Sequence, residues 1–353
     1  PPTVAPMPMS PDISPYLQAV DAEMRSAVQS ANPPLADFYK MMLYHLGWAD
    51  ERFQPARADT GKRLRPVFCL LVCEALAGRY ESALPAAAAV EILHNFSLVH
   101  DDIQDGDRTR RHRPTLWALV GVPQAINAGD ALFALAQVEL LRISGRGLPA
   151  DRVLRCLGIF QRACVQLVEG QYLDMRGEEM TTAGLDYYRQ MIAGKTAALL
   201  GAATAIGAAV ATADDEVIAH AHQFGLELGM AFQMTDDILG LWGDSAVTGK
   251  PAGADLRKKK KSLPIVIAQA QGGALAAAIQ SLFNCAQISD GDVSEVMRLM
   301  DQAGTRAQAR LEVEKHHRQA ITNLLQIPAS ALASTRAVER MLSLAASLTQ
   351  REF

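Results

Sequence analysis

The sequence predicts an all-α protein folded as one large helical bundle. Hydrophobic residues make up 49% of the 353 residues, whereas aromatic residues make up only 6%, and alanine is abundant. Apolar residues recur at helical spacing along most of the chain, and no segment sustains the alternation of a half-buried strand. We therefore expect a flexible tail over residues 1–14 and a single helical domain over residues 15–353.

Prolines, glycines and polar runs divide this bundle into its predicted helices. A helical pattern over residues 15–48 is interrupted at Pro33 and Pro34, because proline lacks the backbone donor that a helix interior needs. We expect further helices over residues 67–76, 85–100, 123–141, 187–200 and 224–244, a long helix that carries residues 170–175, and a few amphipathic helices up to residue 353.

Charge and hydropathy argue against a nucleic-acid-binding protein and against a membrane protein. A net charge of -4 argues against general nucleic-acid binding. The Pro- and Met-rich start lacks the basic region and apolar core of a signal peptide. The longest uncharged stretch, residues 196–213, approaches the length of a membrane span, but its Ala, Gly and Thr content favours a closely packed core helix. Five cysteines within or beside apolar patterns indicate reduced core thiols. We expect a cytoplasmic protein without a transmembrane segment or nucleic-acid partner.

Two adjacent carboxylates, Asp101 and Asp102, end the apolar run over residues 85–100, and Asp105 follows. On a helix, Asp101 and Asp105 lie one turn apart on the same face, where they repel each other unless a cation lies between them. Oxygen ligands suit magnesium, and the arginines at 108, 110, 111 and 113 are fork-shaped donors for phosphate. The segment therefore predicts a metal–diphosphate site, although a solvated acidic-then-basic helix end is the simpler alternative.

A second apolar helix carries a similar pair, Asp236 and Asp237, shortly after Gln233. The position one turn after Asp236 is Gly240, and Asp244 lies roughly 12 Å further along a helix, too far to share one small cation. We therefore expect Asp236 to be the main ligand here. The missing carboxylate predicts weaker binding of one metal ion, and Gly240→Asp is expected to lower the magnesium requirement.

Other polar motifs lie in apolar surroundings. Lys62, Arg63 and Arg65 stand at the entrance of a predicted helix, which indicates an anionic ligand or, more simply, an exposed basic turn. Gln171 and Asp174 need polar partners in their apolar setting. The segment Gly-Lys-Thr at 194–196 lacks the upstream glycine and strand of an NTPase loop. Four lysines at 258–261 form either a solvated face or a cationic lid.

Taken in order, these motifs resemble those of a known family. GKRLRP, HDDIQD with RTRRHRPT, GQYLD, GKT, FQMTDD and the lysine-rich loop follow the order seen in the trans-isoprenyl diphosphate synthases, the polyprenyl synthetase family, and in geranylgeranyl diphosphate synthase-like members in particular. The resemblance covers roughly residues 35–267. It implies an isoprenoid synthase-like bundle with a central active-site cavity, and it implies a homodimer.

The resemblance also implies a ligand for each motif residue. It implies two or three magnesium ions, with manganese as a substitute. The implied metal ligands are Asp101, Asp105 and Asp236. The implied contacts to the allylic diphosphate or its metals are Arg110, Lys195, Thr196, Gln233, Lys250 and Lys260, with Gln171 and Asp174 near the metals. The implied contacts to isopentenyl diphosphate are Lys62, Arg65, His94 and Arg111.

The implied reaction is condensation of isopentenyl diphosphate with an allylic diphosphate through an allylic carbocation. In the family, a bulky residue five positions before the first aspartate limits the product. That residue is Phe96, beside the small Ser97, and Leu93 is a second candidate. We expect geranylgeranyl diphosphate as product. Farnesyl diphosphate synthesis, a class I terpene cyclase-like activity and a non-catalytic partner subunit are the alternatives.

Overall fold

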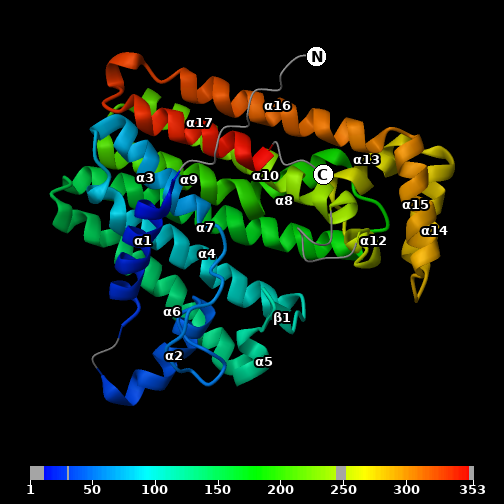
Figure 1. The fold of residues 1–353 in the computed structure, drawn as a ribbon, viewed down its shortest axis with the longest axis horizontal. Helices are drawn as coiled ribbons and strands as arrows, with labels where there is room; N and C mark the ends of the chain where they lie inside the picture. Colours follow the sequence, from blue (N-terminus) through cyan, green and yellow to red (C-terminus); the bar gives the residue numbers. More distant parts are fainter. Residues whose placement is uncertain (1–11, 30–31, 244–251, 350–353) are drawn as a thin grey trace.

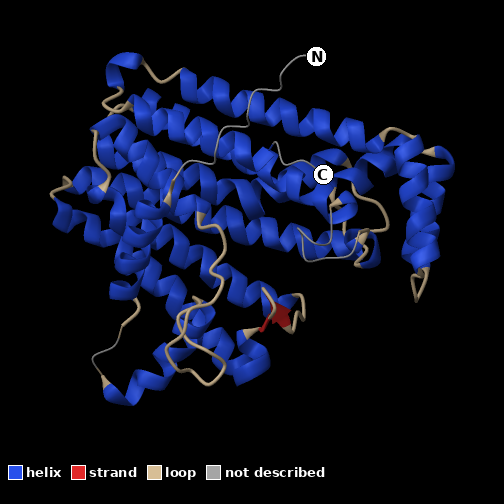
Figure 2. Ribbon diagram, viewed as in Figure 1, coloured by secondary structure: helices blue, strands red, loops and turns tan. Residues whose placement is uncertain are grey.

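Helices dominate the structure, which is a computed structural model that describes residues 12–29, 32–243 and 252–349. Figure 2 shows the described chain as helices joined by loops, with strand only in one short hairpin. The all-α prediction is therefore confirmed. Lys250, Asp244 and most of the predicted tail lie outside the described residues.

The described elements alternate between long core helices and short connecting turns. The longer helices are α1 (Ser14–Ala27), α2 (Ala36–His45), α3 (Leu64–Ala77), α4 (Leu84–Gln104), α6 (Val122–Leu141), α7 (Ala150–Glu179), α8 (Leu185–Ile192), α9 (Ala198–Ala211), α10 (Asp215–Trp242), α13 (Leu263–Gln271), α14 (Gly273–Asn284), α15 (Asp290–Gln302), α16 (Thr305–Leu325) and α17 (Thr335–Thr349). The shorter elements are α5 (Leu116–Val120), α12 (Ala254–Arg257), the π-helical turn η4 (Ala193–Ala197), the 3-10 turns η1 (Pro33–Leu35), η2 (Glu81–Ala83), η3 (Arg142–Arg146) and η5 (Ala329–Ala331), and strands β1 (Thr109–Arg110) and β2 (Arg113–Pro114).

The centre of the bundle is α9, which packs against α3, α7 and α10. Every residue of α9 except the last is buried. A Cβ added at Gly207 would lie 2.2 Å from the carbonyl oxygen of Cys69 on α3, so only glycine permits this crossing. The prediction of a closely packed core helix over residues 196–213 is thus confirmed. Helices α16 and α17 lie along one side of the bundle, and α14 and α15 stand together at one end (Figure 1).

The α4 helix extends further than its sequence pattern indicated. It continues through the first aspartate pair to Gln104, and Asp105 forms its C-terminal cap before Gly106, whose φ is +66°. The run of small and aliphatic residues from Pro85 to Leu93 is buried, which seats the helix between its neighbours. Asp101 and Asp105 therefore lie one turn apart at the end of a buried helix, as the spacing predicted.

The arginine-rich segment after α4 folds as a two-residue hairpin. Arg110 pairs with Arg113, and the two central residues, Arg111 and His112, have φ values of +50° and +61°. Two-residue hairpin turns favour positive φ at both centres, although side chains other than glycine adopt it at a cost. The Tyr44 hydroxyl donates to the carbonyl oxygen of Pro114 at 2.7 Å and anchors the hairpin to α2.

Two helical stretches, Glu81–Gln104 and Leu185–Ala211, are long and apolar enough to cross a membrane. Within the fold, 72% and 83% of their most apolar windows are buried. Such burial is typical of core helices, which bury their apolar surface against other helices.

Candidate active site

Most of the predicted site residues line one cavity of about 500 Å³, between α4, α7, η4 and α10. The loop before α3 and the hairpin after α4 close one side of it, and the lysine-rich segment contributes to the other. The predicted residues in its wall are Lys62, Arg65, His94, Ser97, Asp101, Asp105, Arg110, Arg111, Gln171, Lys195, Thr196, Gln233, Asp236 and Lys260.

The first aspartate motif presents two carboxylates to the cavity and buries the third. Asp102 is 1% exposed and accepts a hydrogen bond from Arg110 Nε at 2.7 Å. Asp101 faces the cavity, and burial raises its pKa to about 6. Lys195 and Arg110 act to lower this pKa, and Asp105 and Asp174 act to raise it, but burial is the largest effect and keeps the pKa high. A cation bound beside Asp101 would favour the charged form of this carboxylate.

The second motif repeats this division between a cavity residue and a buried one. Asp236 lines the cavity, whereas Asp237 is buried and accepts hydrogen bonds from the Tyr188 hydroxyl at 2.7 Å and from the backbone N–H of Leu263 at 3.0 Å. Gln233 Nε2 donates to the other Asp237 oxygen at 2.8 Å. Burial raises the pKa of Asp237 to about 7. Asp237 thus joins α10 to α8 and α13.

A carboxylate from another element occupies the space beside Gly240. A Cβ added at Gly240 would lie 2.6 Å from Asp255 Oδ2 and 2.8 Å from Asp255 Cγ. Asp255 belongs to α12, directly before the lysine-rich segment. The sequence prediction treated position 240 as a missing carboxylate, but the structure places a different carboxylate against it.

Two glycines allow the close helix contact that places Lys195 beside the carboxylates of the cavity. A Cβ at Gly170 would lie 2.0 Å from the backbone nitrogen of Lys195, and one at Gly194 would lie 2.6 Å from the carbonyl oxygen of Gln166. This contact between α7 and the π-helical turn η4 brings Asp174 beside Lys195, and their side chains form an ion pair. Burial disfavours a charged lysine, but Asp174 and Asp101 outweigh burial and raise the pKa of Lys195.

Thr196 and Gln171 also find polar partners next to this cation. The Thr196 hydroxyl donates to Gln233 Oε1 at 2.8 Å, which connects η4 to the second aspartate motif. Gln171 Nε2 donates to Gln104 Oε1 at 2.9 Å, next to the first motif. Asp174 thus pairs with Lys195, and the amide nitrogen of Gln171 pairs with Gln104, as their setting predicted.

The opposite side of the cavity is basic. A Cβ at Gly61 would lie 2.4 Å from Arg111 Nη2, so this glycine, with φ of +75°, leaves room for the Arg111 guanidinium. Arg65 and Arg111 lie near His94, and its burial together with their charges lowers the pKa of His94 well below its usual value. His94 is therefore neutral at pH 7 and offers one N–H donor among fixed cations.

The lysine run divides between the cavity and the neighbouring helix. Lys258 and Lys260 line the cavity, and Lys258 Nζ lies 3.3 Å from Asp107 Oδ1. Lys259 Nζ donates to the carbonyl oxygen of Cys285 at 2.8 Å, and Lys261 Nζ lies 4.6 Å from the centre of the Phe283 ring. Alternate lysines of the run thus face the cavity, and a lid formed by them stays a prediction.

Comparisons with known proteins agree with this geometry. The polyprenyl synthetase family model matches residues 48–300. The chain belongs to the polyprenyl synthetase family. It is 42% identical over 283 residues to a geranylgeranyl diphosphate synthase of Mycobacterium tuberculosis (strain ATCC 25618 / H37Rv), an alignment that covers 80% of this chain and 79% of that protein. It is 40% identical over 288 residues to a (2E,6E)-farnesyl diphosphate synthase of the same strain, with the same coverage.

Solved polyprenyl synthetase structures share the fold over nearly the whole chain. The crystal structure of a polyprenyl synthetase from Streptomyces coelicolor A3(2) matches with a TM-score of 0.86 and 36% identity, and the match covers 94% of this chain and 96% of that one. A geranylgeranyl pyrophosphate synthetase from Pyrococcus horikoshii Ot3 matches with a TM-score of 0.83 and 31% identity, covering 95% and 96%.

The residues predicted to limit product length are divided between the cavity wall and the helix packing of this polyprenyl synthetase. Among the described residues its wall includes Ser97 but neither Phe96 nor Leu93. Phe96 packs between His100 and Phe133, with ring centres 4.9 Å and 5.1 Å away, in an aromatic column between α4 and α6. Leu93 is completely buried in the core. Control of length by Phe96 or Leu93 stays a prediction.

Several residues in the cavity wall were not predicted as ligands. They are Thr60, Leu64, Glu91, Leu98, Asp107, Leu167 and Phe232, whereas Arg63 and Lys258, which also line the cavity, belong to basic runs already identified in the sequence. The clearest missed signal is Glu91, the only charged residue in an otherwise apolar stretch over residues 83–93. A fully buried carboxylate is costly unless other charges compensate for it, so its presence in such a helix indicates nearby cations.

The carboxylates in the cavity of this polyprenyl synthetase fit a metal ion that is also bound by the phosphates of a substrate. Three carboxylates, Asp101, Asp105 and Asp236, line the same cavity from two helices. Within the described ranges, however, no three acidic, histidine or cysteine side chains lie close enough to form a ready-made metal site. Carboxylates supply the oxygen ligands that magnesium prefers, and magnesium commonly binds through one or two carboxylates plus substrate phosphates.

Proposed function

We propose that this chain is a magnesium-dependent trans-prenyltransferase that condenses isopentenyl diphosphate with an allylic diphosphate to give geranylgeranyl diphosphate. The observation that carries the proposal is a single cavity with two kinds of charged wall. One wall combines carboxylates with Lys195 and Arg110, and the other combines Lys62, Arg65 and Arg111 with a neutral His94. Membership of the polyprenyl synthetase family and the names of its relatives support this assignment.

The carboxylate wall is suited to the allylic diphosphate. Asp101, Asp105 and Asp236 would hold magnesium, which when bound offsets the charge of the diphosphate. Lys195 keeps its proton because Asp174 and Asp101 raise its pKa, so it presents a fixed positive charge. Arg110 is held in place by Asp102 at 2.7 Å. Such fixed charges stabilise the negative charge that develops on the leaving diphosphate.

The basic wall is suited to isopentenyl diphosphate. Arg65 and Arg111 provide planar donors for phosphate, and Lys62 adds a point charge. These cations need no metal to bind a diphosphate, which distinguishes this subsite from the carboxylate wall. The double bond of a substrate held here attacks the allylic cation. The condensation product is then a cation, which loses a proton to form the new double bond. Because no residue in the wall is an obvious strong base, the released diphosphate accepts that proton in this proposal.

The apolar part of the wall protects the cation from water. Leu98, Leu167 and Phe232 line the cavity between the charged groups. Apolar side chains exclude water that would otherwise capture the carbocation. The small Ser97 leaves room beside them for a growing chain, which favours a twenty-carbon product over a fifteen-carbon one.

A homodimer is part of this proposal. Helices α6 and α7 lie side by side, joined by a hydrogen bond from Gln161 to Gln137 of 2.7 Å. They expose several large apolar side chains, Val122, Ile126, Val138, Leu141, Leu154, Val165, Val168, Tyr172 and Met175. Such a face is costly in water, and a second copy would bury it. Light scattering should give the mass of a dimer, and Val168→Glu should shift it toward the monomer.

A product assay tests the proposed reaction. The purified chain is incubated with magnesium and with dimethylallyl or farnesyl diphosphate, with and without isopentenyl diphosphate, and the products are identified by mass spectrometry. We expect geranylgeranyl diphosphate from both primers, and only when isopentenyl diphosphate is present. A cyclised product formed from the allylic substrate alone would support the terpene cyclase alternative instead, and inactivity of the folded chain would support the non-catalytic subunit.

The same assay applied to Phe96→Ala tests the limit on length. Removing the ring opens space between His100 and Phe133, so we expect longer products with little change in the first condensation. Leu93→Ala tests the second candidate. It removes a fully buried side chain and is expected to lower stability by about 2–5 kcal/mol, and longer products from this variant would place the limit at Leu93. An unchanged distribution for Phe96→Ala would place the limit elsewhere.

A further inference from the structure

We propose that the ion pair between Asp21 and Arg63 positions the binding site for isopentenyl diphosphate. Asp21 lies on α1, and Arg63 lies between Lys62 and Arg65, two of the predicted ligands of that substrate. The inference rests on the proposed function and adds to it a role for α1, which contributes no residue to the cavity wall among the described residues.

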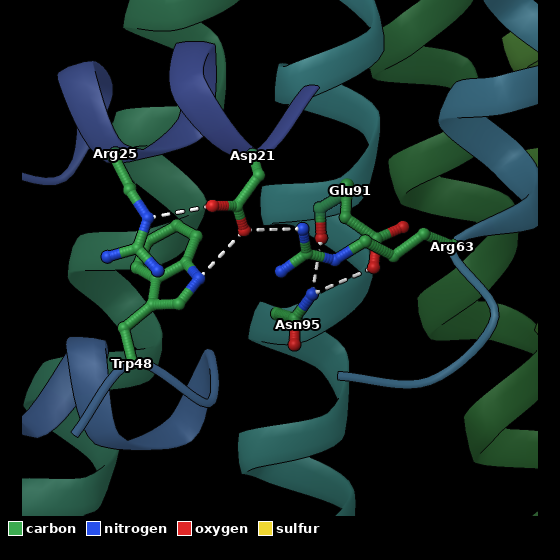
Figure 3. Close-up of polar contacts among 6 residues, drawn as sticks. All are labelled: Asp21, Arg25, Trp48, Arg63, Glu91 and Asn95. Carbon is green, nitrogen blue, oxygen red and sulfur yellow. Dashed lines mark hydrogen bonds and ion pairs between the residues drawn. The ribbon is translucent and has the colours of Figure 1, made fainter. Parts of the chain in front are cut away.

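The Arg63 side chain is buried and hydrogen-bonded, unlike that of a typical surface arginine. Its side chain is 5% exposed, and its Nη1 donates to Asp21 Oδ1 at 2.8 Å. Figure 3 shows the side chain extending past Glu91 toward Asp21. Its backbone is left-handed, with φ of +45°, immediately before α3 begins at Leu64. A side chain other than glycine adopts this conformation at a cost, which surrounding contacts must offset.

Asp21 is the centre of several contacts that fix this arginine. Arg25 Nε donates to Asp21 Oδ2 at 2.7 Å, and Trp48 Nε1 donates to Asp21 Oδ1 at 2.8 Å (Figure 3). Burial alone would raise the pKa of Asp21, but the hydrogen bonds from Arg25, Arg63 and Trp48 outweigh burial and lower it. The carboxylate is therefore charged at neutral pH and remains a strong acceptor.

The other end of Arg63 lies near a buried carboxylate in the cavity wall. Glu91 is 3% exposed, and its Oε1 accepts a hydrogen bond from Asn95 Nδ2 at 3.3 Å. Burial raises the pKa of Glu91, while Arg63, Arg65 and Arg111 act against this increase. Arg63 thus bonds to α1 and lies close enough to a buried carboxylate of α4 for its charge to act on it.

α1 itself is fixed to the rest of the bundle. The Tyr16 hydroxyl donates to Glu74 on α3, and Arg340 Nη1 on α17 donates to the same hydroxyl at 2.7 Å. Asp21 therefore holds Arg63 from a rigid support. If this support is lost, the strained backbone of the loop is free to relax, and Lys62 and Arg65 lose their preset positions. Binding that depends on preset donors then weakens.

The test measures KM for each substrate separately in Asp21→Asn. We expect KM for isopentenyl diphosphate to rise at least about fivefold, the scale of losing one hydrogen bond of ordinary strength. KM for the allylic diphosphate and kcat should change less than about twofold, because the charged wall that binds it is formed by other elements. Arg25→Gln is the matched control. It removes another donor to Asp21 but leaves Arg63 tethered, and it should leave both KM values unchanged.

Two further variants separate positioning from other roles. Arg63→Gln should raise the same KM, and the double variant Asp21→Asn with Arg63→Gln should be no worse than the more severe single variant. Asp21→Glu, which keeps the charge, should recover part of the affinity. If Asp21→Asn does not fold, Arg63→Lys provides the same comparison, because lysine keeps the charge but lacks the planar fork.

Three results would overturn the inference. The first is an equal rise in both KM values of Asp21→Asn, and the second is a loss of its thermal stability without a change in KM. The third is a rise in KM for isopentenyl diphosphate in Arg63→Gln that is absent in Asp21→Asn. The last would make Arg63 a direct ligand. A wild-type chain that never incorporates isopentenyl diphosphate would instead contradict the proposed function itself, so the two failures are distinguishable.

Discussion

The two aspartate motifs use their first two carboxylates in the same way and differ at the third. On α4 and on α10, the first aspartate, Asp101 or Asp236, lines the cavity. The second, Asp102 or Asp237, is buried and hydrogen-bonded to the protein. Adjacent residues on a helix point about 100° apart, so a pair of aspartates divides naturally between ligand and scaffold.

The third position shows how similar motifs can be completed differently. Asp105 of α4 lies in the cavity wall, whereas α10 has Gly240 beside the carboxylate of Asp255. The buried members also differ. Asp102 holds a single arginine that itself faces the cavity, and Asp237 joins three helices. A loss of Asp102 should therefore disturb the site, and a loss of Asp237 should disturb the fold.

The largest expected effect tests whether the two motifs act together. Asp101→Ala, Asp105→Ala and Asp236→Ala should each lower turnover at least about a hundredfold, the scale of removing one strong electrostatic stabiliser. Steady-state rates at saturating magnesium measure this effect. Glu179→Ala, at an exposed position at the end of α7, is the control and should keep nearly full activity. Near-native turnover of Asp101→Ala or Asp236→Ala would remove that helix from the metal assignment.

A smaller effect concerns stability and compares the two buried aspartates. Burial raises the pKa of Asp237 to about 7, against an unfolded value of about 4. Between these values the folded state binds a proton that the unfolded state has lost, so the carboxyl group's contribution to stability falls as pH rises. Asparagine does not titrate. The stability of Asp237→Asn relative to wild type should therefore improve by about 2–4 kcal/mol from pH 4 to pH 8.

Chemical denaturation in the presence of a chelator, at both pH values, measures this difference. For Asp102→Asn the relative improvement should be smaller, because burial raises that pKa only to about 6. A relative stability of Asp237→Asn that is independent of pH would show that the carboxyl group titrates normally in the folded protein.

The smallest effect concerns Gly240. The sequence alone suggested that Gly240→Asp would lower the magnesium requirement. In the structure, however, the side chain added by this substitution would meet the carboxylate of Asp255. We now expect the magnesium concentration for half-maximal rate to stay the same or rise, because two carboxylates so close repel each other. Gly240→Ala controls for the added side chain without the charge. A clear fall in the magnesium requirement of Gly240→Asp would show that the missing ligand had been restored.

Helical periodicity and motif order were sufficient to predict the fold class and most of the cavity wall. Asp101, Lys195 and Asp236 come from distant parts of the sequence, and the resemblance to the family brought them together correctly. Spacing along one helix also predicted the relation of Asp101 to Asp105. These features depend on local geometry or on the order of the motifs along the chain.

Features that depend on contacts between distant elements could not be predicted from sequence. The crossing at Gly170 and Gly194 requires the relative placement of α7 and η4. The neighbours Lys259 and Lys260 differ only in which way the backbone turns them, and Lys259 has φ of +53°. The Asp21–Arg63 pair joins residues 42 positions apart, and neither side chain shows from its local pattern that the other is its partner.

The most direct test of the central claim is manganese binding followed by electron paramagnetic resonance, with manganese in place of magnesium. The carboxylates of the two helices form no ready-made three-residue site among the described residues, so we expect tight binding only when inorganic diphosphate is present. Asp105→Asn and Asp236→Asn should each reduce the number of ions bound with diphosphate. Equal binding with and without diphosphate, unaffected by both substitutions, would contradict a metal site shared between α4, α10 and the substrate.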